Sequence, residues 1–217
     1  AMSGWAMAGY PKAVVEALVQ RKQAGEDLSF GLITGANVPW LDETLGAEKL
    51  VNRRAPMVAS RTLAVQANSG SLSYVEQQMS KMPRLLRSNS FGEIDITVVE
   101  ALGFDENGNL IPTSSVGMTH YLMDAADQII VEINAAQPEV LRDLHDVYVP
   151  AAAPGTPLPW KTTSATAGFP AKHWWISALP RSSSSAWRSN ARPWKKSPPK
   201  TPVLLSAVPR KPMPPRM

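Results

Sequence analysis

The residues best suited to ligand chemistry stand in a glycine-bearing loop near the start of the chain. Residues 3–14 read SGWAMAGYPKAV and come directly before a predicted helix. Gly4 and Gly9 permit close approach of the backbone to a ligand, and the start of a helix offers free N–H groups to an anion or an acyl oxygen. The loop lacks the Gly-Lys-Ser/Thr of a phosphate-binding P-loop, so a simple strand-to-helix turn is the alternative interpretation.

A second loop of small residues, PTSSVG at 112–117, lies between a predicted strand and a predicted helix. In an open α/β sheet, the loops at the carboxyl ends of the strands form the ligand crevice. Because both loops precede helices, we expect them to converge on one crevice. The alternative interpretation is a hydroxyl-rich helix cap without a ligand.

Four basic side chains are weaker candidates. His120 and His145 have no partner at metal-ligand spacing, which favours a surface or capping role for each. Arg53 and Arg54 have the chemistry to hold a phosphate, but a solvated helix end is the favoured interpretation.

Two glutamates, Glu100 and Glu132, come at the ends of apolar runs. They are either functional carboxylates or strand-end residues that pair with a neighbouring base. No Ser-His-Asp set can be assembled around them, and the sequence predicts no catalytic residue and no metal ligand.

Alternating strands and helices must position these loops. Residues 94–101 (IDITVVEA) and 128–134 (QIIVEIN) are the clearest strands, apolar and β-branched as strands buried on both faces are. The alternation predicts an α/β fold with an open, largely parallel sheet flanked by helices. The further strands are predicted at 28–34, 71–76, 110–113 and 147–149, and the helices at 11–25, 41–51, 59–68, 81–87 (interrupted by Pro83) and 119–126.

The composition changes abruptly after Pro154. Residues 1–154 contain 11 Lys and Arg against 18 Asp and Glu, a net charge of −7, whereas residues 155–217 contain 11 Lys and Arg and no acid. The second segment also holds 12 of the 20 prolines and 5 of the 7 tryptophans. We therefore place a boundary there, and the pI of about 9.4 describes neither part.

Several classes of protein are excluded. The absence of cysteine excludes a disulfide scaffold and a thiol nucleophile. The sequence contains no run of about 18 apolar residues, so no transmembrane helix is predicted. The apolar opening lacks the basic region of a cleavable signal, so cytoplasm is the default expectation, with mitochondria as the alternative for a eukaryotic parent.

The chain resembles the acetyl-CoA hydrolase/transferase family, and in particular the N-terminal domain of succinyl-CoA:acetate and related carboxylate CoA-transferases. The resemblance covers residues 3–150 in seven ordered segments: GYPKAV, LITGA (32–36), NRRAP (52–56), EIDITVVEA (93–101), IPTSSVG (111–117), IIVEIN (129–134) and LHDVYVP (144–150).

This resemblance implies a class I CoA-transferase (NagB/RpiA/CoA-transferase-like) fold and a homodimeric parent. Such enzymes form a glutamyl-CoA thioester and pass CoA to a free carboxylate or to water, with the oxyanion held by backbone N–H groups. The CoA thioester is the substrate, and no permanently bound cofactor is implied. The residues that match the family's two loops, and so are expected to contact it, are Gly4, Trp5, Ala6, Gly9, Tyr10, Ser115, Val116 and Gly117.

The family's nucleophilic glutamate and most of its CoA contacts lie in a second half that this sequence does not contain. The family also places a helix and a strand before the glycine loop. We therefore expect residues 1–154 to be an incomplete N-terminal domain that is inactive alone and, with sheet edges unpaired, poorly soluble or partly folded.

Residues 155–217 have the composition of a frame-shifted translation. In the adjacent reading frame, each codon consists of the last base of one present codon and the first two bases of the next. In that frame His173-Trp174 must encode Leu, Trp174-Trp175 must encode Val and Trp175-Ile176 must encode Asp, which returns acids and apolar residues to the segment. We expect this tail to be aberrant and unstructured, from a frameshift between about Tyr148 and Lys161. The alternative is a genuine disordered basic arm, to which five tryptophans are a poor match.

Two other functions stay open. One is a protein that binds single-stranded nucleic acid through the +11 tail and its tryptophans. The other is a non-catalytic α/β domain that binds an acyl-CoA. The leading interpretation involves an acyl-CoA and a small carboxylate, with no nucleic acid and no membrane as partner.

Overall fold

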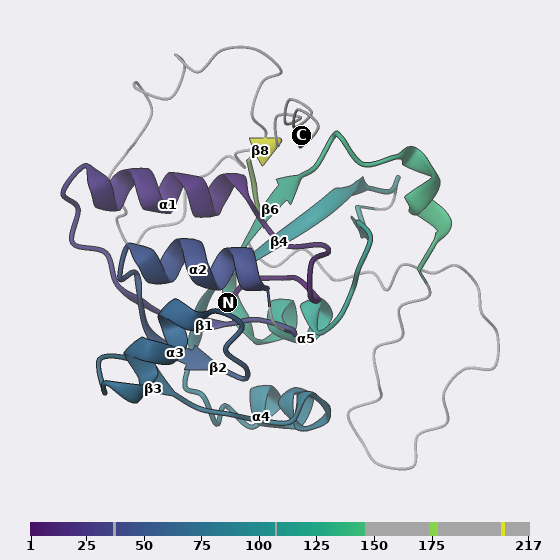
Figure 1. The fold of residues 1–217 in the computed structure, drawn as a ribbon. Coiled ribbons are helices and arrows are strands. Elements are labelled where there is room, and N and C mark those ends of the chain that lie inside the picture. The colour runs from purple at the N-terminus through teal and green to yellow at the C-terminus, as the bar shows by residue number, and fades with distance from the viewer. Residues whose placement is uncertain (37, 107, 146–173, 178–204, 207–217) are drawn as a thin grey trace, which may run out of the picture.

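The computed structural model describes residues 1–36, 38–106, 108–145, 174–177 and 205–206 (Figure 1). No helix in these ranges is long and apolar enough to cross a membrane. In chain order the elements are α1 (Ala13–Gln23), β1 (Phe30–Ile33), α2 (Pro39–Ala47), β2 (Val51–Ala55), α3 (Arg61–Asn68), β3 (Ser73–Tyr74), η1 (Met79–Lys81), α4 (Met82–Arg87), β4 (Ile94–Phe104), β5 (Leu110–Pro112), α5 (Thr119–Ala125), β6 (Ala126–Ile133), η2 (Glu139–Asp143), β7 (Trp174–Ser177) and β8 (Leu205–Ser206).

The strands form a small and a large sheet. The small sheet has the order β1-β2-β3 and is parallel. The large sheet has the order β5-β4-β6-β7, with β8 also beside β6. Its pairs are parallel except for β4 and β5, which form an antiparallel hairpin. The predicted α/β fold with a largely parallel sheet is confirmed.

The first three residues join the two sheets. The amide of Met2 donates to the carbonyl of Ile33 in β1 at 2.9 Å, and the amide of Ser3 donates to the carbonyl of Val98 in β4 at 2.7 Å. Met2 and Val98 pair as a parallel bridge. Residues 1–3 therefore lie as a short extended segment between β1 and β4, and the glycine loop leaves from the carboxyl end of that segment.

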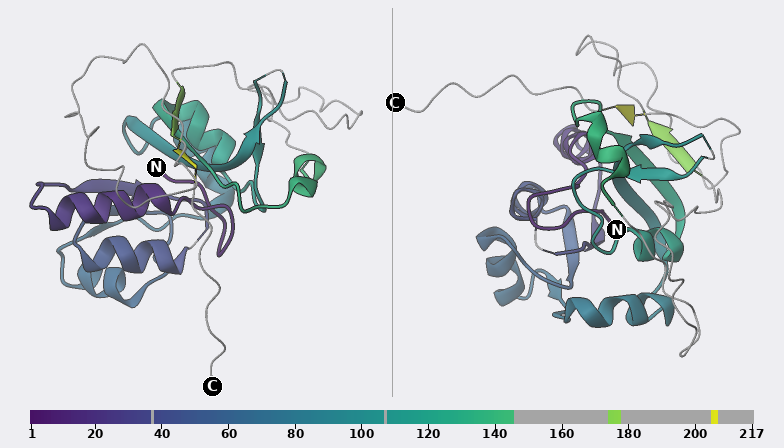
Figure 2. Two further views of the ribbon diagram at one scale, coloured as in Figure 1. Left: turned by 90° about the horizontal axis from the view of Figure 1, so that it is seen from above. Right: turned by 90° about the vertical axis from the view of Figure 1, so that its right-hand side faces the viewer.

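A hydrophobic core lies on each face of β4, and Figure 2 shows helices on both sides of the large sheet. One core contains Val15 of α1, Leu41 of α2 and Leu63 of α3, together with Val98 of β4. The other core gathers residues of α4, α5 and the opposite face of β4, among them Met82, Leu86, Val99, Leu122 and Met123. Because neighbouring residues of a strand face opposite sides, Val98 and Val99 confirm that β4 is buried on both faces.

Two predicted elements differ from the structure. The helix expected at 41–51 ends at Ala47, and residues 51–55 form strand β2. Pro83 lies at the start of α4 and does not interrupt it, because the first turn of a helix needs no amide from proline. The strand expected at 147–149 lies outside the described residues.

Within the tail, two short segments form strands. Trp174–Ser177 pairs in parallel with β6 through Ile129, Ile130 and Val131, and Leu205–Ser206 pairs with β6 farther along. The remaining residues of the tail lie outside the described ranges, so the expectation of an unstructured tail stays a prediction.

Candidate functional site

The glycine loop contains a tight hairpin. The amide of Trp5 donates to the carbonyl of Ala8 at 2.9 Å, and the amide of Ala8 donates back to the carbonyl of Trp5 at 3.1 Å. Ala6, at the tip, has a φ of 54°, which is unusual for a residue other than glycine. Gly4 and Gly9 flank the hairpin with φ of 130° and 64°. Glycine is needed at both because the chain reverses within a few residues.

The two predicted loops lie against each other. The hydroxyl of Ser115 donates to the carbonyl of Ala8 at 3.0 Å. A Cβ atom at Gly9 would lie 2.4 Å from Ser115 Oγ, and one at Gly117 would lie 3.0 Å from the indole of Trp5. The structure thus brings the loops together, as their positions before helices predicted, and glycine makes this close approach possible.

A third loop, which the sequence analysis did not assign to the site, completes the junction. A Cβ atom at Gly35, just after β1, would lie 2.2 Å from the carbonyl oxygen of Gly4 and 3.7 Å from the indole of Trp5. Gly35 belongs to the LITGA segment, whose strand-loop pattern was the available signal. Trp5 therefore lies where loops from three parts of the chain meet.

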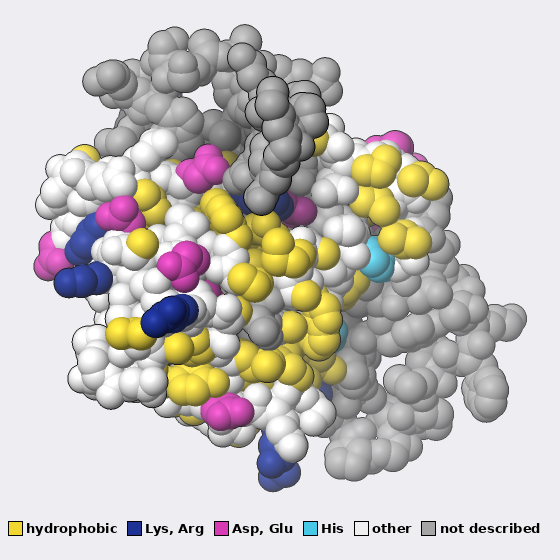
Figure 3. All heavy atoms as spheres, in the orientation of Figure 1, with side chains coloured by type: hydrophobic (Ala, Val, Ile, Leu, Met, Phe, Trp, Pro, Cys, Tyr) yellow, Lys and Arg dark blue, Asp and Glu magenta, His cyan; other side chains and the backbone are white. Residues whose placement is uncertain are grey.

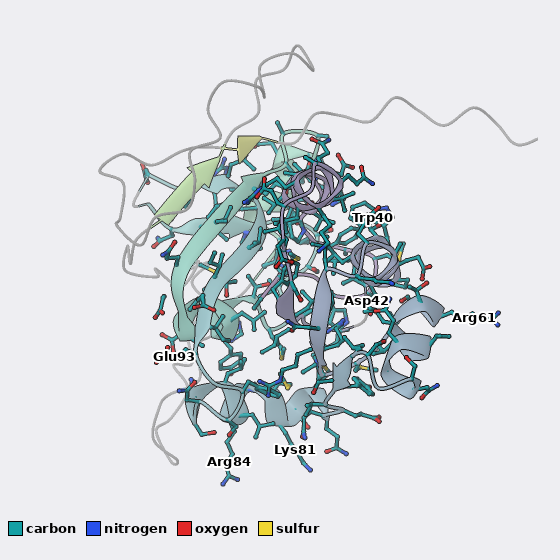
Figure 4. The ribbon with its side chains drawn as sticks, turned by 90° about the vertical axis from the view of Figure 1, so that its left-hand side faces the viewer. Trp40, Asp42, Arg61, Lys81, Arg84 and Glu93 are labelled. Carbon is teal, nitrogen blue, oxygen red and sulfur yellow. The ribbon has the colours of Figure 1, made fainter. Side chains whose placement is uncertain are left out.

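The surface of this junction is apolar. The side chains of Trp5 and Met7 are 43% and 65% exposed, large values for such residues. Figure 3 shows apolar side chains gathered over the loop between the N-terminus and α1. Tyr10, also expected in the site, is buried instead, and its ring lies 5.7 Å from that of Trp40, centroid to centroid. Figure 4 shows Trp40 on α2.

Glu100 and Glu132 lie beneath the loops as a buried carboxylate pair. They are register partners on the parallel strands β4 and β6. Glu100 forms an ion pair with Lys12 and accepts hydrogen bonds from Thr113 Oγ1 at 2.9 Å and from Asn134 Nδ2 at 3.2 Å. The predicted pairing with a base therefore holds for Glu100, although Glu100 lies within β4 and not at its end.

Glu132 has a different partner, the start of α1. Its carboxylate accepts hydrogen bonds from the amide of Lys12 at 2.8 Å and from that of Val14 at 3.0 Å. Burial raises the pKa of Glu132, the amides at the start of α1 act against this shift, and the charge of Glu100 adds to it. The expectation that these helix amides are free for a ligand is therefore wrong, because a carboxylate of the chain occupies them.

Arg53 and Arg54 lie on β2, so neither forms a solvated helix end. Arg54 is completely buried, pairs with Asp42 of α2 at 2.9 Å and donates to Thr34 Oγ1 at 2.9 Å. Figure 4 shows Asp42 beside this sheet. Arg53 donates to the carbonyl of Phe91 at 3.1 Å. Arg54 holds a carboxylate of the protein rather than a phosphate.

Of the two histidines, His120 departs from the surface or capping role expected for both, whereas His145 is half-buried and contacts a backbone carbonyl. His145 places Nε2 2.5 Å from the carbonyl oxygen of Thr113 and so contacts the second loop. Both ring nitrogens of His120 are buried without a hydrogen-bond partner among the described residues. The centroid of its ring lies 3.9 Å from that of Tyr121, with the two ring planes tilted by 41°. Burial lowers the pKa of His120. In the described part of the chain, no cluster of three or more His, Asp or Glu could hold a metal ion.

Comparisons with known proteins match the chain to one family. The family model described as the acetyl-CoA hydrolase/transferase N-terminal domain matches residues 1–162. The succinyl-CoA:acetate CoA-transferase of Clostridium kluyveri is 33% identical over 153 residues, which are 68% of this chain and 28% of that protein. The acetyl-CoA hydrolase of Kluyveromyces lactis is 31% identical over 162 residues, 70% of this chain and 31% of that protein.

A second transferase and a solved structure extend the comparison. The propanoyl-CoA:succinate CoA transferase of Escherichia coli is 30% identical over 71% of this chain and 32% of its own length. The crystal structure of RipA from Yersinia pestis has a TM-score of 0.52 at 19% identity, covering 63% of this chain and 33% of that one, and so shares the fold. The chain thus spans about a third of the curated relatives it matches. It belongs to the acetyl-CoA hydrolase/transferase family, whose N-terminal domain it represents.

Proposed function

We propose that residues 1–154 form part of an enzyme that moves CoA between short acyl-CoAs and carboxylates such as acetate or succinate, or that hydrolyses the thioester. The names of the relatives support this reaction class. The observation that carries the proposal is the contact of Ser115 with Ala8, because it joins the two loops that the family resemblance assigns to the substrate.

The chemistry of the junction suits the acyl and thioester end of the substrate. Trp5 and Met7 offer apolar surface to a short acyl chain. The cation beneath them, Lys12, is already paired with Glu100, so it is not free to hold the phosphates of CoA. We expect backbone amides of the two loops to face the thioester oxygen, where they would stabilise a developing oxyanion. No permanently bound cofactor is needed for this role.

The ligand contacts of the proposal come from the two predicted loops. Trp5 and Ala6 provide the exposed wall, and Tyr10 acts from below by packing on Trp40. We also propose that the full-length protein of which this chain is a part forms a homodimer. The residues proposed to contact the ligand are Gly4, Trp5, Ala6, Gly9, Ser115, Val116 and Gly117, and the buried Tyr10 supports them without contacting it.

The nucleophile is not assigned to this chain. Covalent catalysis by a carboxylate requires an oxygen that reaches the thioester carbon. Glu100 and Glu132 are both buried, and their oxygens are engaged by the ion pair and by the amides of α1. We therefore expect the 217-residue chain to bind an acyl-CoA without turning it over.

Saturation-transfer NMR with acetyl-CoA tests the binding. We expect the acetyl and pantetheine protons to receive more saturation than the adenine protons, and Trp5→Ala to reduce the transfer. Val65→Ala is the matched control, because Val65 is 56% exposed on α3, outside the junction. Equal transfer in all three proteins, or saturation of adenine alone, would contradict the proposed site. Hydrolysis of acetyl-CoA to acetate and CoA, or formation of acetyl-CoA from succinyl-CoA and acetate, by the chain alone would contradict the expected inactivity.

A further inference from the structure

A single buried carboxylate contacts both loops of the candidate site. Oε2 of Glu100 pairs with Lys12 Nζ at the end of the glycine loop, and Oε1 accepts from Thr113 Oγ1 at the start of the second loop. Its amide donates to Ser3 Oγ at 3.0 Å, and that hydroxyl donates to the carbonyl of Gly9 at 2.7 Å. Glu100 therefore touches the glycine loop at its beginning and its end.

The burial of Glu100 makes these contacts hard to release. Its side chain has no exposed surface, whereas that of Lys12 is 28% exposed. When a buried carboxylate loses its partners, neither water nor hydrogen bonds compensate its charge, and this is costly. Hydrogen bonds to a charged group are also stronger than neutral ones. Movement of either loop away from β4 would therefore expose or unpair Glu100.

The other groups around Glu100 strengthen the arrangement. Asn134, which follows β6, donates to Oε2 of Glu100, and Glu132 of β6 is the register partner of Glu100 on the neighbouring strand β4. Glu132 holds the start of α1, so Lys12 is fixed through its backbone by one glutamate and through its ammonium group by the other. The end of the glycine loop is thus held at two points.

We propose that Glu100 is a positioning residue that holds the glycine loop and the second loop in register and thereby sets the spacing of their backbone amides. That spacing matters for acyl-CoA only if the proposed function is correct. The holding of the loops is a property of the chain itself and can be measured without a ligand.

Hydrogen exchange of the full 217-residue chain separates the contacts. Glu100→Ala is expected to speed exchange in peptides covering both 3–12 and 113–118 by about tenfold, as loss of one charge-assisted hydrogen bond would. Lys12→Met should speed exchange in the peptide 3–12, and Thr113→Val should speed exchange in the peptide 113–118. In the double variant Lys12→Met/Glu100→Gln, the glutamine oxygen still accepts from Thr113 without an unpaired charge, so 113–118 should stay protected.

Thr97→Val is the matched control. Thr97 is buried on the same strand, and its hydroxyl donates to the carbonyl of Leu122 at 2.9 Å, so the variant loses a buried hydrogen bond that touches neither loop. It should lower the free energy of unfolding of the chain without speeding hydrogen exchange specifically in the two loops. If Glu100→Ala and Thr97→Val give the same uniform increase, Glu100 has only a structural role and the inference is overturned.

The affinity for acetyl-CoA, measured on the same variants, separates this inference from the proposed function. We expect about a tenfold loss in Glu100→Gln and little change in Thr97→Val. If the unchanged chain binds no acyl-CoA, the proposed function fails, while the exchange pattern still decides whether Glu100 positions the loops. Binding that is equal in Glu100→Gln and the unchanged chain would overturn the link between positioning and substrate.

Discussion

The hydroxyl of Ser115 donates a hydrogen bond to the carbonyl oxygen of Ala8, although the two residues are 107 positions apart in the chain. The contact is possible because Gly9, the next residue, carries no side chain. It joins the loop before α1 to the loop before α5, so the candidate site depends on the packing of two distant segments.

Replacement of Gly9 by alanine tests this junction. The φ of 64° strains any residue with a Cβ, and the new methyl group would overlap Ser115 Oγ. We expect Gly9→Ala to lower the free energy of unfolding by about 1–3 kcal/mol from the backbone alone, with the overlap in addition. Ser115→Ala in the same chain should restore part of the loss, because it removes the nearest atom. Additive effects in urea unfolding of the two single variants and the double variant would show that the residues do not touch.

Gly35→Ala should be more damaging than alanine elsewhere in the same segment. Its Cβ would lie 2.2 Å from the carbonyl oxygen of Gly4, a backbone atom that cannot rotate away. We expect a loss of about 3 kcal/mol or more in the free energy of unfolding, as for severe overpacking. Gly31→Ala on β1 is the control, because its Cβ would meet Arg53 Cβ at 3.6 Å, an ordinary contact. Similar melting temperatures for the two variants would refute the close approach of Gly35 to Gly4.

The buried glutamate Glu132 predicts a pH dependence of stability. Burial, and after it the charge of Glu100, raises its pKa in the folded chain, while the unfolded chain ionises near 4.5. Between those two pKa values the folded state binds more protons than the unfolded state. The contribution of Glu132 to the free energy of unfolding is therefore fully present below pH 4.5 and is lost as the pH rises through the pKa of Glu132 in the folded chain.

Glu132→Gln removes this titration. The difference in unfolding free energy between the unchanged chain and the variant should fall as the pH rises above 4.5, since the glutamine pays no ionisation cost. Urea unfolding at a series of pH values from about 4 to 8 gives the slope. A difference that grows with pH would mean that the amides of Lys12 and Val14 outweigh burial and lower the pKa of Glu132.

The charge break after Pro154 predicts a change of reading frame in the gene. A segment with 11 basic and no acidic residues follows a segment with a net charge of −7. We expect the coding DNA between about codons 148 and 161 to contain an inserted or deleted base, because the adjacent frame returns Leu, Val and Asp at residues 173–176. Sequencing of that region is the measurement. A single open frame, together with relatives that carry the same tail, would disprove the frameshift.

Local pattern was sufficient for most of the elements that support the site. The runs IDITVVEA and QIIVEIN have the β-branched apolar residues of strands buried on both faces. β4 contains the first run, and β6 contains the second except for its last residue, Asn134. Gly4, Gly9 and Gly117 indicated places where the chain turns or approaches another segment, and each has a positive φ. These features depend on a few neighbouring residues, so they can be read without the tertiary structure.

The roles of the charged residues were decided only by the tertiary structure. Arg54 looked like a solvated cation because its partner Asp42 is 12 positions earlier, on another element. Glu132 finds the amides of Lys12 and Val14 at separations of 120 and 118 positions. A charge can be buried only when its partners are brought to it, and local sequence does not encode partners so far away. The sequence by itself therefore determined the two central strands, the glycine turns and the family, whereas the packing of β4 against β6 decided which carboxylate holds which loop.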